Sequence, residues 1–203
     1  MMPAATHTPA IDPHAQAVLD FWFGRPGDAH HLQPRDEWFR KDEAFDAAIG
    51  ARFGTLIDAA LRGGLAHWAA QPPGALAQIL VLDQFTRNSA RGTAGMFAGD
   101  ARALAAAQAL VASGADRTLA GVQRQFVYLP FEHAEDAAMQ RESMRLFAQL
   151  GDDEPALAGL LEWAHKHAVI IERFGRFPHR NEALGRASTP EEVEFLKQPG
   201  SGF

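Results

Sequence analysis

Apolar residues recur every three or four positions along most of this chain, which is the spacing of one face of an α-helix. Helix-start signals precede several of these segments: Asp12-Pro13, Asp36, Asp100, Pro130, Pro155 and the capping box Thr189-Pro-Glu-Glu192. The predicted helices cover 13–23, 36–53, 56–61, 74–88, 101–112, 116–126, 130–150, 155–174 and a short segment from 190. Valine and isoleucine, which favour strands, are sparse. The pattern predicts an all-α protein of about nine helices packed as antiparallel pairs.

Nothing in the sequence divides the chain into separate domains. The 203 residues are 47% hydrophobic and 22% charged, which is typical of one globular domain. We expect a single domain over 11–203 that follows a disordered leader, 1–10. The start lacks a secretory signal and no apolar run approaches the roughly 18 residues of a membrane span, which favours a cytoplasmic protein with no membrane partner. The net charge of −6 disfavours nucleic acid as a partner, and the lack of cysteine excludes disulfides and thiolate chemistry.

Several ionisable side chains fall on helix faces that the periodicity assigns to the core. Asp83 and Arg87 share the apolar face of one predicted helix and stand four residues apart, so they can pair. Glu135 and Glu142 fall in the middle of a second apolar face, and His167 lies within a third. Because a buried charge without a partner is costly, we expect each of these groups to have one.

The segment 173–186 offers cationic partners for the acids. Its arginines are Arg173, Arg176, Arg180 and Arg186, and interleaved phenylalanines would anchor it to the fold. The guanidinium fork matches both carboxylates and phosphates. With Arg87 included, five arginines stand against the three acids named above, so we expect a positive surplus that a bound anion would balance.

These residues make up the predicted site. The catalytic candidates are His133, Glu135 and His167, because imidazoles and buried carboxyls exchange protons near neutral pH. The ligand-binding candidates are Asp83, Arg87, Asn88, Arg173, Arg176, His179, Arg180 and Asn181. The chain lacks a phosphate loop, a dinucleotide fingerprint and a zinc-binding helix motif, so we expect no cofactor and no metal. A metal held by His133 together with distant ligands stays open as an alternative.

Three motifs resemble those of a known family: Asp83-Gln-Phe-Thr-Arg-Asn88, Pro130-Phe-Glu-His-Ala-Glu135 and Arg173-Phe-Gly-Arg-Phe-Pro-His-Arg-Asn181. Over nearly its whole length the chain resembles a bacterial family called domain of unknown function 924. The resemblance implies a tetratricopeptide-like array of paired helices around a concave surface, closed here by the arginine-rich C-terminal loop. It brings no settled activity and no catalytic residues.

Three functions are consistent with the sequence. The first is a pocket that binds, or acts by acid–base chemistry on, a small ligand with a phosphate or carboxylate group. The second is a tetratricopeptide-like interaction module that binds an acidic peptide or a C-terminal carboxylate. In the third, the arginines only fasten the C-terminal segment. A closed cavity with converging Arg and His side chains would favour the first, an open groove with exposed aromatics the second, and complete internal pairing of every arginine the third.

Overall fold

The protein is described here by a computed structural model, in which residues 10–202 are placed. Its helices are α1 (Pro13–Phe23), α2 (Glu43–Leu61), α3 (Pro72–Ile79), α4 (Thr86–Ser89), α5 (Asp100–Ala112), α6 (Gly121–Glu132), α7 (Ala137–Asp153), α8 (Leu160–Phe174) and α9 (Pro190–Leu196). Residues 10–202 contain no strand, which confirms the predicted all-α class. The proposed leader, 1–10, lies outside this range except for its last residue. None of the helices in the described range is both long and apolar enough to cross a membrane.

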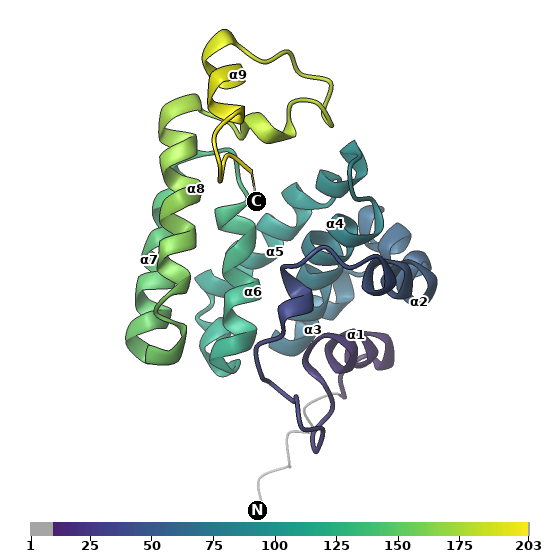
Figure 1. Cartoon of the computed structure of the whole chain (residues 1–203). Coiled ribbons are helices and arrows are strands. Elements are labelled where there is room, and N and C mark those ends of the chain that lie inside the picture. The colour runs from purple at the N-terminus through teal and green to yellow at the C-terminus, as the bar shows by residue number, and fades with distance from the viewer. Residues whose placement is uncertain (1–9, 203) are drawn as a thin grey trace, which may run out of the picture.

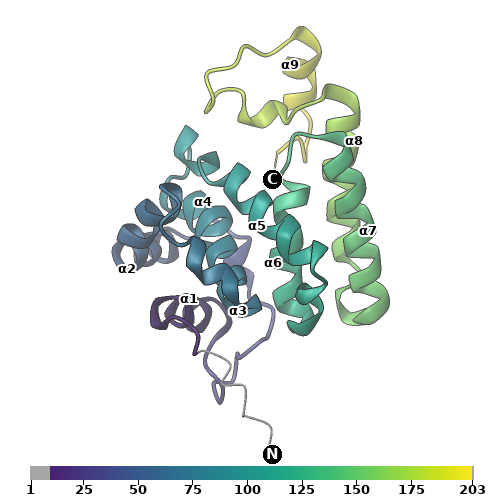
Figure 2. The same ribbon diagram turned by 180° about the vertical axis from the view of Figure 1, so that it is seen from behind.

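The helices form two flanks with α6 between them (Figure 1). α7 and α8 pack side by side along one edge, and α1 and α2 lie at the opposite edge, as the view from behind also shows (Figure 2). α6 contacts α5, α7 and α8, so it connects the two flanks. The tetratricopeptide-like arrangement implied by the family resemblance stays a prediction.

α3 and α4 belong to one continuous helix, in agreement with the single helix predicted for residues 74–88. A π-helical turn, Leu80–Phe85, joins them, and every residue of that turn is buried. Counted in this way, the described part of the chain has eight helices rather than about nine. Single π-helical turns inside α-helices often occur at functional sites. This one contains Asp83 and places its side chain in the interior.

The predicted start of a helix at Pro130 is wrong. Pro130 lies inside the last turn of α6, and α7 begins only after Asp136, whose carboxylate accepts hydrogen bonds from the backbone N–H groups of Ala138 (2.8 Å) and Met139 (2.9 Å). Asp136 therefore supplies a stronger start signal than the proline. Gln140 caps the end of α6 by donating to the backbone oxygens of Glu132 (2.7 Å) and Ala134 (2.8 Å).

The altered boundary moves two of the predicted core acids. Glu135 lies in the loop between α6 and α7 rather than on a helix face. Glu142 lies on α7 but is only partly buried, and its carboxylate pairs with Arg145 at 2.6 Å. The predicted apolar face with both glutamates at its centre is therefore wrong.

Other predicted helix starts also differ: the predicted helix 56–61 continues α2, and the starts predicted at 116 and 155 are 3₁₀ turns that precede α6 and α8. Asp36 begins only a short 3₁₀ turn, η1 (Asp36–Trp38), whereas α2 starts after Asp42, whose side chain accepts from two backbone N–H groups at its start. Asp100 does not cap α5, because its carboxylate is bound by two arginines. Its predecessor Gly99 occupies the cap position instead.

Aromatic side chains pack together in the core where η1 meets α1 and α6. Trp38 of η1 stacks on Trp22 of α1 with ring centroids 5.9 Å apart, and it meets Phe126 of α6 edge-on at 4.9 Å. These contacts fix the segment around η1 against α6. Phe39, the next residue, is left 64% exposed beside them.

The close approach of α5 to the π-helical turn leads to a stability prediction. A Cβ atom on Gly99 would stand against the carbonyl oxygen of Leu82, which is part of the rigid backbone of that turn. We expect Gly99→Ala to lower the free energy of unfolding by about 1–3 kcal/mol, because the backbone must shift. Urea unfolding monitored by circular dichroism measures the change.

A matched control is available in α2. A Cβ atom on Gly54 meets nothing within 4 Å, and its backbone is helical. Gly54→Ala should raise the free energy of unfolding by up to about 1 kcal/mol, because alanine favours a helix. Equal effects of the two substitutions would contradict the packing described for Gly99.

Candidate functional site

A cavity of about 480 Å³ lies where α4, α6, α8 and the loop after α8 meet. Its charged and polar lining consists of Arg40, Gln84, Arg87, Asn88, Arg91, Gln125, Glu132, His133, His167, His179 and Arg180. Trp38, Phe39, Phe97, Leu129, Phe147, Leu160 and Trp163 contribute most of its apolar wall. Cavities of this size hold small metabolites.

Asp83 lies directly behind this cavity and is fully buried. Its Oδ1 is 2.9 Å from Nη1 of Arg87 and 2.7 Å from Nδ1 of His133. Burial alone would raise the pKa of Asp83, but Arg87 and His133 outweigh burial and hold that pKa well below its usual range. Asp83 is therefore an ionised carboxylate, and it fixes the positions of both neighbours.

Asp100 extends this pairing from Arg87 to the C-terminal loop. Nη1 and Nη2 of Arg87 donate to its two carboxylate oxygens at 2.8 and 3.1 Å. Nη1 of Arg180 donates to Oδ2 at 3.3 Å. The four residues Asp83, Arg87, Asp100 and Arg180 thus form a chain of alternating charge, which we call the acid–arginine chain. It links the π-helical turn, α5 and the turn Pro178–Arg180.

Arg180 is held rigidly at the wall of the cavity. Its guanidinium carbon lies 4.4 Å from the ring centroid of Phe177 and 4.7 Å from that of Phe97. The side chain is only 7% exposed, and burial together with the nearby Arg87 lowers its pKa to about 10, so it stays charged at neutral pH. Its Nε is buried and has no hydrogen-bond partner within residues 10–202. A buried cationic donor of this kind is suited to an anionic ligand.

The contact with Asp83 determines the tautomer of His133. Nδ1 carries the proton that is donated to the ionised carboxylate, so Nε2 has the lone pair and is the nitrogen available to a ligand. Burial and the charge of Arg87 lower the pKa of His133, and the ring is neutral at physiological pH. His133 is therefore arranged as a proton acceptor.

Glu132, the neighbour of His133, is a buried carboxylic acid. It is 3% exposed, and burial together with the negative charge of Asp83 raises its pKa to about 8. Oε1 lies 3.1 Å from Nδ1 of His167, which donates to the backbone oxygen of Trp163 at 2.9 Å. Oε2 is buried and has no hydrogen-bond partner among the described residues.

The His167 ring stays neutral as well, because burial lowers its pKa to about 3. Glu132 and His167 are therefore an uncharged pair at neutral pH rather than an ion pair. Two carboxyl–histidine pairs, Asp83 with His133 and Glu132 with His167, thus line one cavity, and their imidazole rings are 6.2 Å apart.

Positive charge exceeds negative charge around the cavity. Four arginines line it: Arg40, Arg87, Arg91 and Arg180. Three carboxylates bind three of them: Asp83 and Asp100 as described, and Asp46, which accepts from Arg91 at 2.7 Å. Arg40 forms no ion pair within residues 10–202, and the neutral Glu132 adds no charge. The surplus predicted from the sequence does not arise from the predicted arginines, because Arg87, Arg173, Arg176, Arg180 and Arg186 each pair with an acid.

Six of the residues singled out from the sequence meet in this cavity: Arg87, Asn88, His133, His167, His179 and Arg180. Asp83 lies behind them. His179 is half enclosed, and burial with the nearby Arg180 lowers its pKa to about 4. Asn88 donates to Asp46 at 2.7 Å, so it helps to hold the wall.

The remaining four candidates lie outside the cavity lining and fasten the C-terminal loop. Glu135 receives Arg186 at 2.6 Å and the backbone N–H of Phe177 at 2.7 Å. Arg176 pairs with Glu192 at 2.6 Å, and Asn181 donates to the same glutamate at 3.2 Å. Arg173 pairs with the exposed Glu191 at 2.8 Å. These contacts explain their positions without a ligand.

Asp100 and Glu132 contribute to the site but were not predicted from the sequence to do so. Asp100 was interpreted as a helix cap, and nothing local to its sequence indicates its distant arginine partners. Glu132 was missed because α6 was expected to end early. With α6 running from Gly121, the spacing of Gln125, Leu129 and Glu132 places all three on one face, which lines the cavity. No group of three or more His, Asp or Glu side chains in the described range is arranged to hold a metal ion.

The raised pKa of Glu132 predicts how stability depends on pH. An unfolded chain loses this proton near its ordinary pKa of 4.5, whereas the folded protein keeps it up to about 8. Unfolding therefore releases a proton between these values, so the contribution of Glu132 is fully present below pH 4.5 and is lost as pH rises through 8. We expect wild type to lose a few kcal/mol relative to Glu132→Gln over that range.

Urea unfolding of both proteins between about pH 5 and pH 9 measures this difference. Other titrating groups are common to both proteins and largely cancel. A difference that does not change with pH would show that Glu132 is already ionised in the folded protein.

Comparisons with known proteins place the chain in a family. A family model described as "Bacterial protein of unknown function (DUF924)" matches residues 18–200. A solved structure, that of the protein of unknown function ATU0120 from Agrobacterium tumefaciens, is 40% identical and has a TM-score of 0.80. That match covers 92% of this chain and 98% of the Agrobacterium protein. No curated protein gives a significant match. The chain belongs to the bacterial protein family of unknown function DUF924.

Proposed function

We propose that the cavity beside the acid–arginine chain binds a small anionic ligand with a phosphate or carboxylate group. The observation that carries this proposal is the presence, in one cavity, of two buried polar atoms without a hydrogen-bond partner among residues 10–202: Nε of Arg180 and Oε2 of Glu132, whose pKa is raised by burial. A buried donor that forms no hydrogen bond is costly, and an anionic oxygen would satisfy it. The surplus positive charge of the arginine lining favours the same ligand.

We further infer that the site supports acid–base chemistry on the bound anion. His133, oriented by Asp83, can accept a proton at Nε2, while Glu132 can donate one from Oε2. A proton acceptor and a proton donor that line the same cavity are the groups that such catalysis requires. His167 holds Glu132 in place and is a positioning residue in this proposal.

One observation favours a second function. Phe39 is 64% exposed and Trp163 is 51% exposed, and both line the cavity. Exposed aromatic residues beside a cationic pocket are also suited to a peptide whose C-terminal carboxylate enters the pocket, as in a tetratricopeptide-like interaction module. A ligand screen that includes acidic peptides separates the two functions.

The test is a thermal-shift screen of phosphorylated and carboxylated metabolites, with acidic peptides as a separate set. A true ligand at 100 times its dissociation constant should stabilise wild type by roughly 2.7 kcal/mol. Arg180→Ala should abolish the shift and Arg180→Lys should reduce it, because lysine keeps the charge but loses the fork. The shift is measured within each variant, so a change in intrinsic stability does not disguise the result.

Arg173→Ala is the matched control. It removes an arginine from the same C-terminal segment, but one that pairs on the surface with Glu191 and does not line the cavity. Its ligand shift should equal that of wild type. An anion that stabilises the Arg180 and Arg173 variants equally would place its binding site elsewhere and contradict the proposal.

A further inference from the structure

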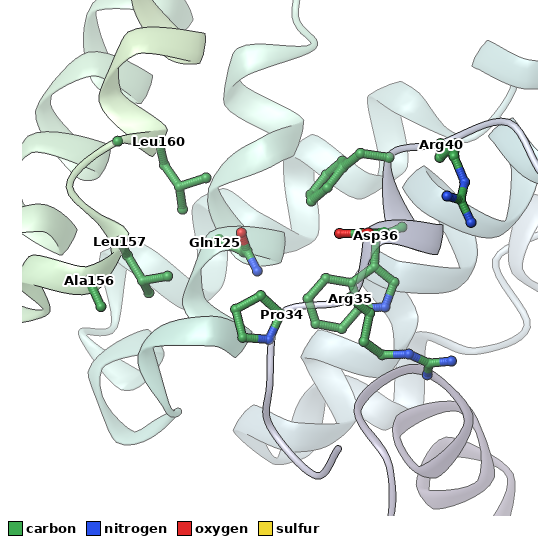
Figure 3. A pocket seen from close by; sticks show the side chains of 11 residues that line it. Pro34, Arg35, Asp36, Arg40, Gln125, Ala156, Leu157 and Leu160 are labelled. Atoms are coloured by element: carbon green, nitrogen blue, oxygen red, sulfur yellow. The ribbon is translucent and has the colours of Figure 1, made fainter. Parts of the chain in front are cut away.

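A second cavity, of about 540 Å³, adjoins the first. Both are lined by Trp38, Phe39, Arg40, Gln125 and Leu160, so the two share a wall. Pro34, Leu157 and Gln125 line the second cavity, and in this view Leu157 lies to the left of Pro34 while the amide of Gln125 lies above it (Figure 3). The two cavities are therefore adjacent, and we call the pair the cleft.

α6 and α8 line this cleft lengthwise and in matching order. On α6 the lining residues are Gln125, Leu129 and Glu132, and on α8 they are Leu160, Trp163 and His167. Glu132 contacts His167, while Gln125 and Leu160 both border the second cavity. Gln125 and Glu132 are seven residues apart on α6, which corresponds to about 10 Å along the helix. The lining that the two cavities share therefore begins about 10 Å from Glu132.

The chemistry of the cleft changes along this length. The first end holds Arg180, Glu132 and the histidines, whereas the second is bounded mainly by proline, leucine, alanine and aromatic side chains. The second cavity has charged side chains of both signs at its edge: Arg35, Asp36 and Arg40. The buried Nε of Arg180, which has no hydrogen-bond partner among residues 10–202, therefore decides where the anionic group of a ligand binds.

The second cavity offers few polar partners to a peptide main chain. The guanidinium of Arg35 donates to the backbone oxygens of Phe21 and Trp22 and points away from the cavity (Figure 3). Nε2 of Gln125 donates to the backbone oxygen of Val122 at 3.0 Å. Most of the lining is apolar, and an alkyl chain can contact such a lining without forming hydrogen bonds.

We propose, on the basis of the proposed anion site, that the ligand is a single-chain amphiphile: an alkyl or acyl chain that ends in a carboxylate or phosphate. The head group binds Arg180 and Glu132, and the chain follows Leu129 and Trp163 into the cavity bounded by Leu157 and Leu160.

Isothermal titration calorimetry tests the proposal with butanoate, hexanoate, octanoate, decanoate and dodecanoate, all below their micelle concentrations. The same chain lengths as alkyl phosphates form the second arm, which identifies the preferred head group. Each buried methylene should strengthen binding about fourfold until the chain fills the second cavity. Arg180→Ala should weaken every member of the series at least tenfold and keep the dependence on chain length.

Ala156→Trp tests the second cavity separately. Ala156 is exposed, lines only the second cavity, and lies far in sequence from the acid–arginine chain. The new ring should remove the gain of decanoate over butanoate and leave the affinity for butanoate unchanged. Val169→Trp, at a 46% exposed position of α8 outside both linings, should behave as wild type.

The possible failures are distinguishable. If butanoate or inorganic phosphate binds in an Arg180-dependent manner but longer chains bind no better, the anion site stands and the amphiphile is excluded. If a peptide with a C-terminal carboxylate binds more tightly than dodecanoate and Ala156→Trp weakens its binding, the occupant of the cleft is a peptide and the amphiphile is excluded. If no member of either series binds, both the anion site and the amphiphile are contradicted.

Discussion

The buried carboxylate of Asp83 is the constraint on which the rest of the site depends. An ionised group in the interior requires partners, and Asp83 has Arg87 from its own helix and His133 from the end of α6. Arg87 is in turn shared with Asp100, which reaches Arg180 in the C-terminal loop. Three segments distant in sequence are thus positioned by one charge. Removing Arg87 would leave the buried carboxylate of Asp83 without a cationic partner, and removing Asp100 would leave the buried Arg180 without its carboxylate, and both changes are costly.

The same constraint leaves Glu132 uncharged. The nearby arginines are already bound to Asp83, Asp100 and Asp46, and the negative charge of Asp83 opposes a second ionised acid beside it. Glu132 therefore keeps its proton and serves as a hydrogen-bond donor rather than an acceptor. A neutral acid, a neutral histidine and a fixed guanidinium can all be present in one cavity because the acid–arginine chain takes up the negative charge elsewhere.

Local periodicity was sufficient to predict part of this arrangement. The four-residue spacing of Asp83 and Arg87, the place of His167 in an apolar stripe and the capping box at Thr189 are all confirmed. Pro130 indicated a helix start in the wrong place, because it lies inside the last turn of α6 and the helix continues to Glu132. The π-helical turn has no sequence signature that we can identify.

The ion pairs between residues distant in sequence could not be predicted, for a different reason. Arg180 and Asp100 are 80 residues apart, and no helical spacing relates them. The sequence indicated that the arginines of 173–186 need acids, but not which acids. In the structure Arg180 lines the cavity. The other three arginines, Arg173, Arg176 and Arg186, form ion pairs that hold the C-terminal loop.

The most direct measurement is an infrared difference spectrum of wild type against Glu132→Gln across the pH range. A protonated carboxyl has a carbonyl stretching band that is separate from the bands of a carboxylate. The account predicts that this band is present in wild type at neutral pH, disappears as pH rises past about 8, and is absent from the variant. A wild-type spectrum at neutral pH in which Glu132 contributes only carboxylate bands would contradict the neutral acid on which the proposed site depends.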